Sequence, residues 1–394
     1  MGKCLLAIII AEFKNIFLNK NVISVMIIGP LVYCFFYPQP YVKEVLTNVS
    51  IGVLDQDNST MSRELIRNVN ATKTVNVTTM VNSMSQAEHL LKTRQITGIL
   101  VIPLRFEQKI LRGESSPIAF YGDASYILIY NNVATTLSSV VAAMGSKISV
   151  ERQIVQGIDP AVAQGGSQPF ITNMIGLFNP QSGYATYVLP PVFILILHQL
   201  LFIGILLTTF SSKDKTATLF ASFTTVTSSW LQSLLFIVGK IFTFLSVYLV
   251  MLSFYLTMVI KWYDIPNLAD YSDILLFIFI FLCTTITFAI ALSSFMKRAE
   301  DPFLLMVPIS ILLFFSSGIS WPKELIPSAI TFIAHLFPAV PSMIAFVKIA
   351  EMGAPLALVL PEMYNLLLLF IIYFIIALYC YHRQFKRLQH RSHP

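Results

Sequence analysis

Long apolar runs dominate the chain, and their spacing is uneven. Six such runs are present, and a long polar segment separates the first from the second. A bilayer core about 30 Å thick is crossed by a helix of about 20 apolar residues. We therefore predict six transmembrane helices, at residues 21–37, 185–210, 231–260, 274–296, 302–317 and 363–381.

The polar segment 38–184 contains two alternating periodicities. Short β-rich runs are separated by stretches with helical spacing, which is typical of a small mixed α/β sheet. Strands are expected at 49–54, 74–78, 96–102 and 117–121, and helices at 59–67, 85–94 and 103–111, with Pro103 in the first turn of the last helix. The predicted fold class is an α-helical polytopic membrane protein with six transmembrane helices and an α/β extracytoplasmic domain between helices 1 and 2.

Residues 125–156 form a long helical stretch rich in Ala, Ser, Val and Thr. At 1.5 Å per residue it could reach about 45 Å, and it is expected to stand off the membrane or to pack beside a partner. A seventh span is the alternative, but Asn131, Asn132, Ser138 and Lys147 interrupt its apolar character. Residues 157–183, rich in Gly and Pro, are expected to form a loop that returns to the membrane.

The two ends of the membrane region differ from simple spans. Residues 1–20 place apolar side chains at near-helical spacing with Glu12 and Lys14 among them, which predicts an amphipathic helix on the cytoplasmic leaflet. A plain extension of the first span is the alternative. Within the five-helix membrane domain 185–382, the connection 318–361 is apolar yet broken by prolines, so we expect re-entrant helices on the outer side, near 329–337 and 341–350. Pro30 is expected to kink the first span.

Composition and charge agree with a membrane protein and give it an orientation. Charged residues are only 12% of the chain and the mean hydropathy is +0.72, whereas about a quarter of residues are charged in soluble domains. Lys and Arg near span ends favour the cytoplasm, which predicts both termini, including the basic tail 383–394, on that side. The basic residues expected to face the cytoplasm are Lys3, Lys14, Lys20, Lys213, Lys215, Lys297, Arg298, Arg383, Lys386, Arg387 and Arg391.

Several classes of function lack support in the residues. The segment 38–184 has eleven basic and ten acidic residues, so the net charge of +6 reflects membrane topology and not a nucleic-acid groove. No clustered Cys/His pattern suggests a metal site, and no catalytic residues are expected. Gly239 and Lys240 lack the upstream glycine loop that would cradle the phosphates of ATP.

Three runs together resemble the ABC-2 type permeases of bacterial ABC exporters, in the subgroup with a large periplasmic insert after the first helix. They are Val53–Ser59, Gly98–Pro103 followed by Phe106, and Ser317–Pro322 with Ile326–Pro327 and Leu336–Pro338. The resemblance implies a connecting helix at the N-terminus, two permease subunits per transporter, and a separate ABC ATP-binding subunit that binds ATP and Mg²⁺. It thus implies a non-catalytic chain with no cofactor of its own.

One stretch departs from the family's pattern. Such permeases usually carry an Arg-Glu-x-Gly-Thr type sequence after the second span, whereas this chain has Ser212–Thr218 without that glycine. We expect contact with the ATP-binding subunit here and in the loop after the fourth span, although a plain positively charged loop is the alternative. The predicted coupling residues are Lys213, Asp214, Lys215, Thr216, Lys297 and Arg298.

A substrate path or gate is expected at four other residues. His198 is interpreted as the one ionisable side chain deep within a span, and such groups are functional candidates by default, with a hydrogen-bonded structural histidine as the alternative. Trp321, Glu324 and His335 lie in the outer re-entrant region, where ordinary interfacial solvation competes with a gating role.

The expected function is a permease subunit that moves an apolar or amphipathic, drug-like or lipid-like substrate out of the cytoplasm or the bacterial inner membrane. A second permease subunit, and a periplasmic adaptor leading to an outer-membrane channel, are further expected partners beside the lipid bilayer. The alternative is a membrane-anchored receptor or assembly scaffold whose periplasmic domain binds a partner without transport.

Overall fold

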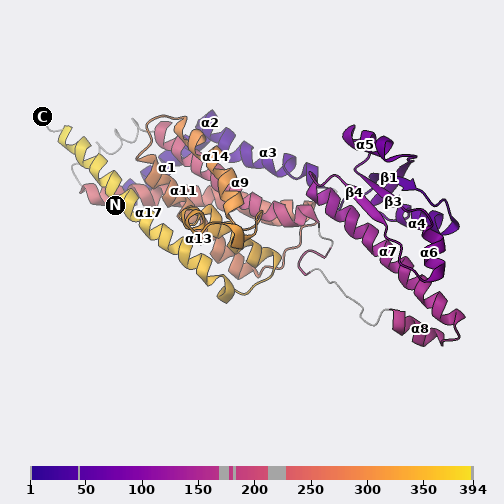
Figure 1. Ribbon diagram of the computed structural model, residues 1–394. Helices are drawn as coiled ribbons and strands as arrows, with labels where there is room; N and C mark the ends of the chain where they lie inside the picture. Colours follow the sequence, from indigo (N-terminus) through magenta and orange to yellow (C-terminus); the bar gives the residue numbers. More distant parts are fainter. Residues whose placement is uncertain (1, 43–44, 168–176, 181–182, 212–227, 392–394) are drawn as a thin grey trace. The chain divides into compact units, whose positions relative to one another are not determined.

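The computed structural model describes residues 2–42, 45–167, 177–180, 183–211 and 228–391 (Figure 1). Its contacts divide the chain into two compact units. We call Met1–Val42 with Leu177–Pro394 the membrane unit, and Lys43–Gly176 the α/β unit. The structure is 72% helical with one small sheet, so the predicted fold class is confirmed.

The α/β unit is built on a four-stranded sheet with strand order β2-β1-β3-β4. Strands β1, β2 and β3 run parallel, and β4 pairs antiparallel with β3. Each predicted strand is present within a few residues of its expected position. The bounds are Val49–Asp55 for β1, Val75–Met80 for β2, Gly98–Ile102 for β3 and Ala119–Gly122 for β4.

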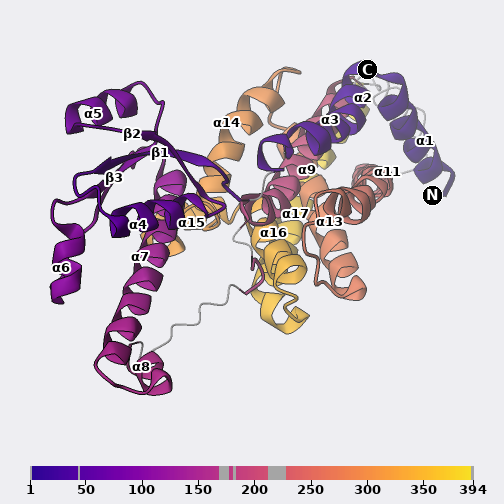
Figure 2. The same cartoon turned by 90° about the vertical axis from the view of Figure 1, so that its right-hand side faces the viewer.

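Helices cover both faces of this sheet (Figure 2). Helices α4 (Thr60–Asn70), α6 (Phe106–Arg112) and α7 (Ile127–Val155) share one hydrophobic core with β1 and β3, while α5 (Met84–Lys92) packs on the other face. The prediction that Pro103 starts α6 is wrong. Arg105 has a left-handed backbone, with φ of 61°, and the helix begins only after it.

Helix α7 is long and apolar enough to cross a membrane. Its buried side chains Val133, Leu137 and Met144 nevertheless pack into the core beneath the sheet. Because these contacts belong to the α/β unit, we assign α7 to that unit and not to the bilayer. Beyond it, α8 (Pro160–Ser167) is a short helix in a segment where we expected a loop.

Five of the six expected spans correspond to helices that pass the same test of length and apolarity. They are Lys20–Tyr41, Tyr184–Ser211 (α9), Ser229–Trp262 (which includes α11, Ser229–Phe254), Tyr271–Ser293 (α13) and the first part of α17 (Leu356–Arg391). The sixth, α14 (Asp301–Ser316), has 16 residues and is shorter than the test requires. Since α7 also qualifies, the described part of the chain has six candidate spans by length and composition, with a different membership from the predicted six.

Helix α9 is the most enclosed of these candidates, because 83% of its most apolar stretch is buried. It contacts α1, α3, α11, α13, α14 and α16, and Figure 2 shows it among them. The hydrophobic core of the membrane unit is therefore organised around α9.

The N-terminal helix α1 (Gly2–Leu18) is separate from the first span, so the interpretation as a plain extension is wrong. Asn19 has an extended backbone, with φ of −95° and ψ of 111°, and α2 (Lys20–Ile23) begins after it. The next turn, η1 (Ser24–Ile28), is a π-helix that ends just before α3 (Gly29–Phe36), whose second residue is Pro30. Proline has no backbone N–H to donate to the preceding turn of a helix, and the π-turn before Pro30 accommodates this missing hydrogen bond.

The connection before α17 contains a sharply bent helix pair. Helix α15 (Ser328–Ala334) is followed by α16 (Ala339–Phe346) with the π-turn η5 (Val347–Glu351), and the two parts meet at 93°. The hydroxyl of Tyr373 in α17 donates to the carbonyl of Leu336 at the bend, at 2.7 Å. That contact satisfies a carbonyl freed where the helix breaks, as apolar surroundings require.

Candidate functional site

A buried ion pair joins α1 to α11 inside the membrane unit. Lys240 Nζ lies 2.9 Å from Glu12 Oε1, and the side chains are 0% and 5% exposed. The rings of Phe236 and Phe244, one turn to either side of Lys240, lie 5.2 and 5.4 Å from its ammonium group. Charges in apolar surroundings are costly unless paired, and an aromatic face also stabilises a cation. Lys240 and Glu12 are therefore each other's principal electrostatic partner.

The same contact surface requires a glycine. A Cβ on Gly239 would lie 2.7 Å from Ile8 Cγ2, much closer than carbon atoms pack. Ile8 and Glu12 are one turn apart on the buried face of α1, which also carries Cys4 and Ile16. Gly239 thus lets α1 approach closely enough for the ion pair to form.

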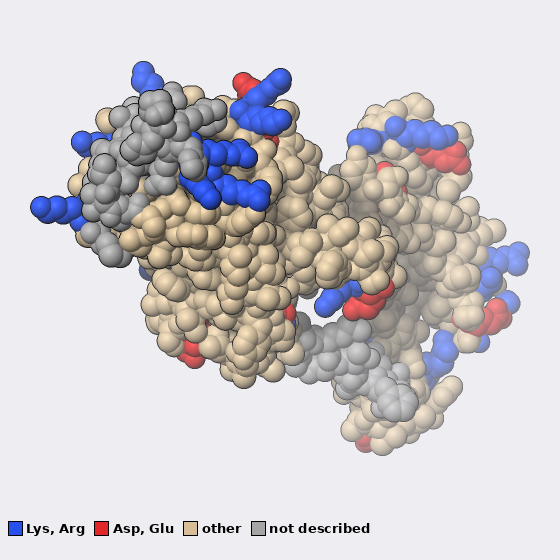
Figure 3. All heavy atoms as spheres, turned by 90° about the vertical axis from the view of Figure 1, so that its left-hand side faces the viewer, with Lys and Arg blue, Asp and Glu red and all other residues tan. Residues whose placement is uncertain are grey.

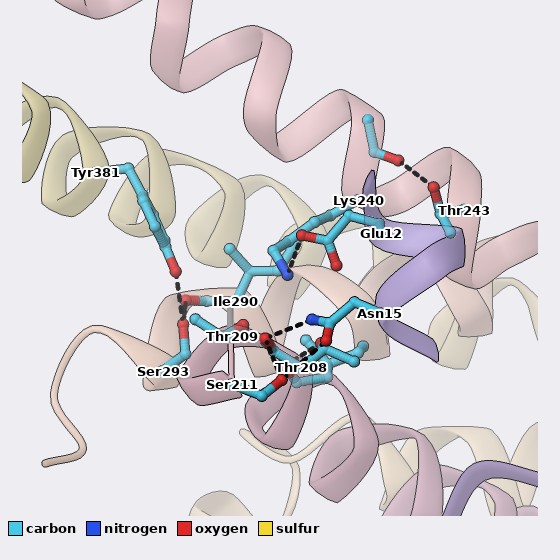
Figure 4. A network of polar contacts seen from close by, with 12 residues as sticks. Glu12, Asn15, Thr208, Thr209, Ser211, Lys240, Thr243, Ile290, Ser293 and Tyr381 are labelled. Carbon is cyan, nitrogen blue, oxygen red and sulfur yellow. Dashed lines mark hydrogen bonds and ion pairs between the residues drawn. The ribbon is translucent and has the colours of Figure 1, made fainter. Parts of the chain in front are cut away.

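Helix α1 also holds the end of α9. Asn15 Nδ2 donates to the carbonyl of Thr208 at 2.9 Å, and the hydroxyl of Ser211 donates to Asn15 Oδ1 at 3.0 Å (Figure 4). Carbonyls in the last turn of a helix lack intrahelical partners, and Asn15 supplies one. Ser211 is the last residue of α9, so α1 is hydrogen-bonded to the end of this helix just before residues 212–227.

A second contact at the same end of the bundle joins α13 to α17. Ser293 and Tyr381 hydroxyls lie 2.9 Å apart, and Ser293 also donates to the carbonyl of Ile290 (Figure 4). Ser293 is the last residue of α13 and precedes the turn that leads into α14. The ends of α9 and α13 are thus both anchored by polar contacts.

The predicted coupling residues lie next to these anchors in the chain. Lys213, Asp214, Lys215 and Thr216 fall outside the described residues. Lys297 and Arg298 are exposed, and their backbone N–H groups donate to Asp301 Oδ2 at 2.9 and 2.8 Å, which shapes the turn into α14. Figure 3 shows Lys and Arg side chains gathered on one face of the membrane unit.

His198 is completely buried in α9. Among the described residues no hydrogen-bonding partner lies beside either ring nitrogen, and the ring packs against Phe288 with centroids 6.0 Å apart. Phe288 also contacts Phe337 at the bend between α15 and α16. His198 is thus connected by packing to the bent helix pair, and its side chain is enclosed in this conformation.

The other expected gate residues lie on either side of α15. Trp321 and Glu324 are exposed on the connection that follows α14. His335 follows α15, and its Nδ1 lies 2.8 Å from the carbonyl of Thr331, one turn earlier. A gating role for these residues and for His198 stays a prediction.

Sequence reasoning missed the ion pair. The interpretation of His198 as the one ionisable residue deep within a span is wrong, since Lys240 is fully buried in α11. The signal was available: Lys240 interrupts the apolar run 231–260, and Glu12 stands one helical turn from each of Ile8, Ile9 and Ile16. What the pattern could not give is that these two charges face each other.

Comparison with known proteins gave one family. The family described as "ABC-2 family transporter protein" matches residues 20–379 of the chain. A search of curated proteins found no match.

Proposed function

The chain belongs to the ABC-2 family of transporter proteins, and from this premise we propose that it is the permease subunit of an ATP-driven exporter. Family membership makes it a membrane transport component and implies association with an ABC ATP-binding subunit. The observation that carries the proposal is the family match over nearly the whole length of the chain. ATP and Mg²⁺ would be bound by the partner subunit, and this chain would contribute no catalytic residue.

The proposed route of coupling runs through α1 and two loops. Residues Lys213–Thr216 follow α9, and Lys297 and Arg298 follow α13. Movement of these loops by an ATP-binding subunit would pull on the ends of α9 and α13. The contacts of Asn15 with Thr208 and of Glu12 with Lys240 support transmission of that movement to α1 and α11.

Charge supports a topology with both termini in the cytoplasm. The N-terminal segment, the loops after α9 and α13 and the C-terminal tail are rich in Lys and Arg, which favours the cytoplasmic side. The α/β unit would then lie outside the bacterial inner membrane, where it could dock an adaptor that leads to an outer-membrane channel. Two permease subunits would enclose the path of an apolar or amphipathic substrate.

Co-purification tests the proposal. The tagged chain is expressed with an ABC ATP-binding subunit of the same genome, and the complex is isolated in mild detergent. We expect the subunit to be retained, and we expect combined charge reversal at Lys213, Asp214 and Lys215 to release it, while reversal at the exposed Lys92 of α5 leaves it bound. Failure of every ATP-binding subunit to bind would instead favour a receptor or scaffold.

A further inference from the structure

An apolar groove opens on the surface of the membrane unit between α1, η1 and α11. Its volume is about 400 Å³, within the range of about 300–1,000 Å³ that is usual for small-molecule sites. Phe13 and Phe17 form one wall, Ile27 a second, and Val247, Val250 and Met251 the third. Phe17 and Val250 are 51% and 72% exposed, so the groove is accessible from outside the bundle.

The chemistry of the walls selects an apolar occupant. The two phenylalanine rings are stacked with centroids 6.3 Å apart and present a continuous apolar surface. Ser246 is the one polar residue of the lining, and its hydroxyl donates to the carbonyl of Thr243 within α11 at 2.8 Å. The described lining therefore offers no free hydrogen-bond donor, and a hydrocarbon chain fits it better than a polar ligand.

Exposed basic residues adjoin the lining residues of the groove along the chain. Lys14 is exposed on α1 between Phe13 and Phe17, and Lys20 is exposed at the start of α2. Glu12 is the one acidic residue of α1, and it is buried against Lys240, so it is not available to pair with these lysines. An occupant with an apolar chain and a negatively charged head would satisfy both the groove and its edge.

We infer that this groove binds an anionic phospholipid of the adjoining leaflet. One acyl chain lies between Phe17 and Val250, and the phosphate group is held near Lys14 and Lys20. A bound lipid of this kind would fill the space that remains between α1 and α11 beyond the Glu12–Lys240 pair. The inference stands on the groove and its charges, and it does not depend on what the protein transports.

Photo-crosslinking in the bilayer tests the inference. The full-length protein is reconstituted with phosphatidylglycerol that carries a diazirine on one acyl chain, and labelled peptides are mapped by mass spectrometry. We expect residues 13–27 and 246–251 to be labelled several-fold more than the exposed apolar surface of α17 around Leu368. Equal labelling of the two surfaces would overturn the inference, as would a crosslink to a second copy of the chain in place of lipid.

Two variants separate the groove from its charges. Val250→Trp, which fills an exposed part of the groove, should reduce the labelling several-fold, whereas Leu368→Trp on α17 should not. The double variant Lys14→Gln/Lys20→Gln should remove a preference for phosphatidylglycerol over phosphatidylcholine. Unchanged labelling in Val250→Trp would contradict the acyl-chain site, and a wild-type protein without that preference would contradict the anionic headgroup.

Discussion

At the scale of single residues, the proposed coupling of α1 to α11 depends most on the Glu12–Lys240 pair. Both side chains are enclosed, and each charge is stabilised chiefly by the other. Removal of one partner leaves an uncompensated buried charge, whereas replacement of both by neutral side chains is often tolerated. The pair is therefore expected to behave as a unit.

Glu12→Gln should destabilise the membrane unit by about 3–5 kcal/mol, because it leaves the ammonium group of Lys240 buried without a counter-charge. The measurement is the midpoint of thermal unfolding of the purified protein in detergent. Glu12→Gln/Lys240→Met should recover most of the loss, and Glu88→Gln, which breaks an exposed pair with Lys92, should change nothing measurable. A single variant that melts with the wild type would show that the pair is not formed.

In the α/β unit, the carboxylate of Asp57 takes part in a second set of side-chain contacts that is important for the fold. Asp57 Oδ2 accepts a hydrogen bond from the N–H of Glu107 at 3.0 Å, and Glu107 Oε1 accepts one from the N–H of Met61 at 3.3 Å. The Asp57 carboxylate therefore accepts a hydrogen bond from the N-terminal turn of α6, and the Glu107 carboxylate accepts one from the N-terminal turn of α4. Carboxylates are favoured there because free N–H groups point outward at helix starts.

Acid should loosen the start of α6 through Asp57. Desolvation opposes its ionisation, but hydrogen bonds from backbone N–H groups, that of Glu107 first, outweigh this and lower the pKa of Asp57 below its ordinary 3.8. Since the folded pKa is the lower one, the stabilisation is present above pH 3.8 and is lost as the pH falls through the folded value.

Amide exchange of α6 measures this effect in the intact protein. Protection of its first amides should fall on acidification below pH 3.8 in the wild type. Asp57→Asn should lower that protection already at neutral pH and remove most of the acid dependence. Asp123→Asn serves as the control, because the Asp123 side chain accepts a hydrogen bond from the nearby N–H of Ser125. Equal behaviour of the two variants would refute the role of Asp57.

At the scale of elements, the pattern of apolar positions predicted what depends on local periodicity. The β-rich runs around Val49 and Gly98 form parallel strands, and their short, nearly continuous apolar character is typical of strands buried on both faces of a sheet. The start of α6 was missed because the left-handed backbone of Arg105 is not encoded by an Asn or Gly signal. The face of α1 that turns inward was missed because apolar side chains surround it, with Leu6, Ile10 and Leu18 exposed.

The close approach of α1 to α11 gives an element-scale prediction. Gly239→Ala should push α1 away, since the added methyl group would overlap Ile8. Cys4, buried on the inner face of α1, should then react several-fold faster with maleimide in a Cys380→Ser background. Gly145→Ala in α7, where nothing lies within 4 Å of the added atom, is the matched control. Unchanged reactivity of Cys4 would mean that α1 does not rest on Gly239.

At the scale of the whole molecule, hydropathy alone indicated a membrane protein, and the family match agrees with the resemblance carried by three short runs. Hydropathy could not assign α7, because a helix that packs on a sheet can be as apolar as a span. It also could not reveal the coupling of α1 to α9 and α11, which depends on contacts between residues nearly 200 or more positions apart. Neither the hydropathy of the chain nor the three short runs identifies the substrate.

The proposed export function is measured as ATP-driven transport by the complete complex. The chain and its ATP-binding subunit are reconstituted in proteoliposomes, and movement of fluorescent amphipathic dyes is followed with and without Mg·ATP. We expect ATP-dependent movement of at least one dye, which should be abolished when the ATP-binding subunit cannot hydrolyse ATP and strongly reduced by Glu12→Gln in a complex that stays assembled. Dye movement that is the same with and without ATP would contradict the proposed export function.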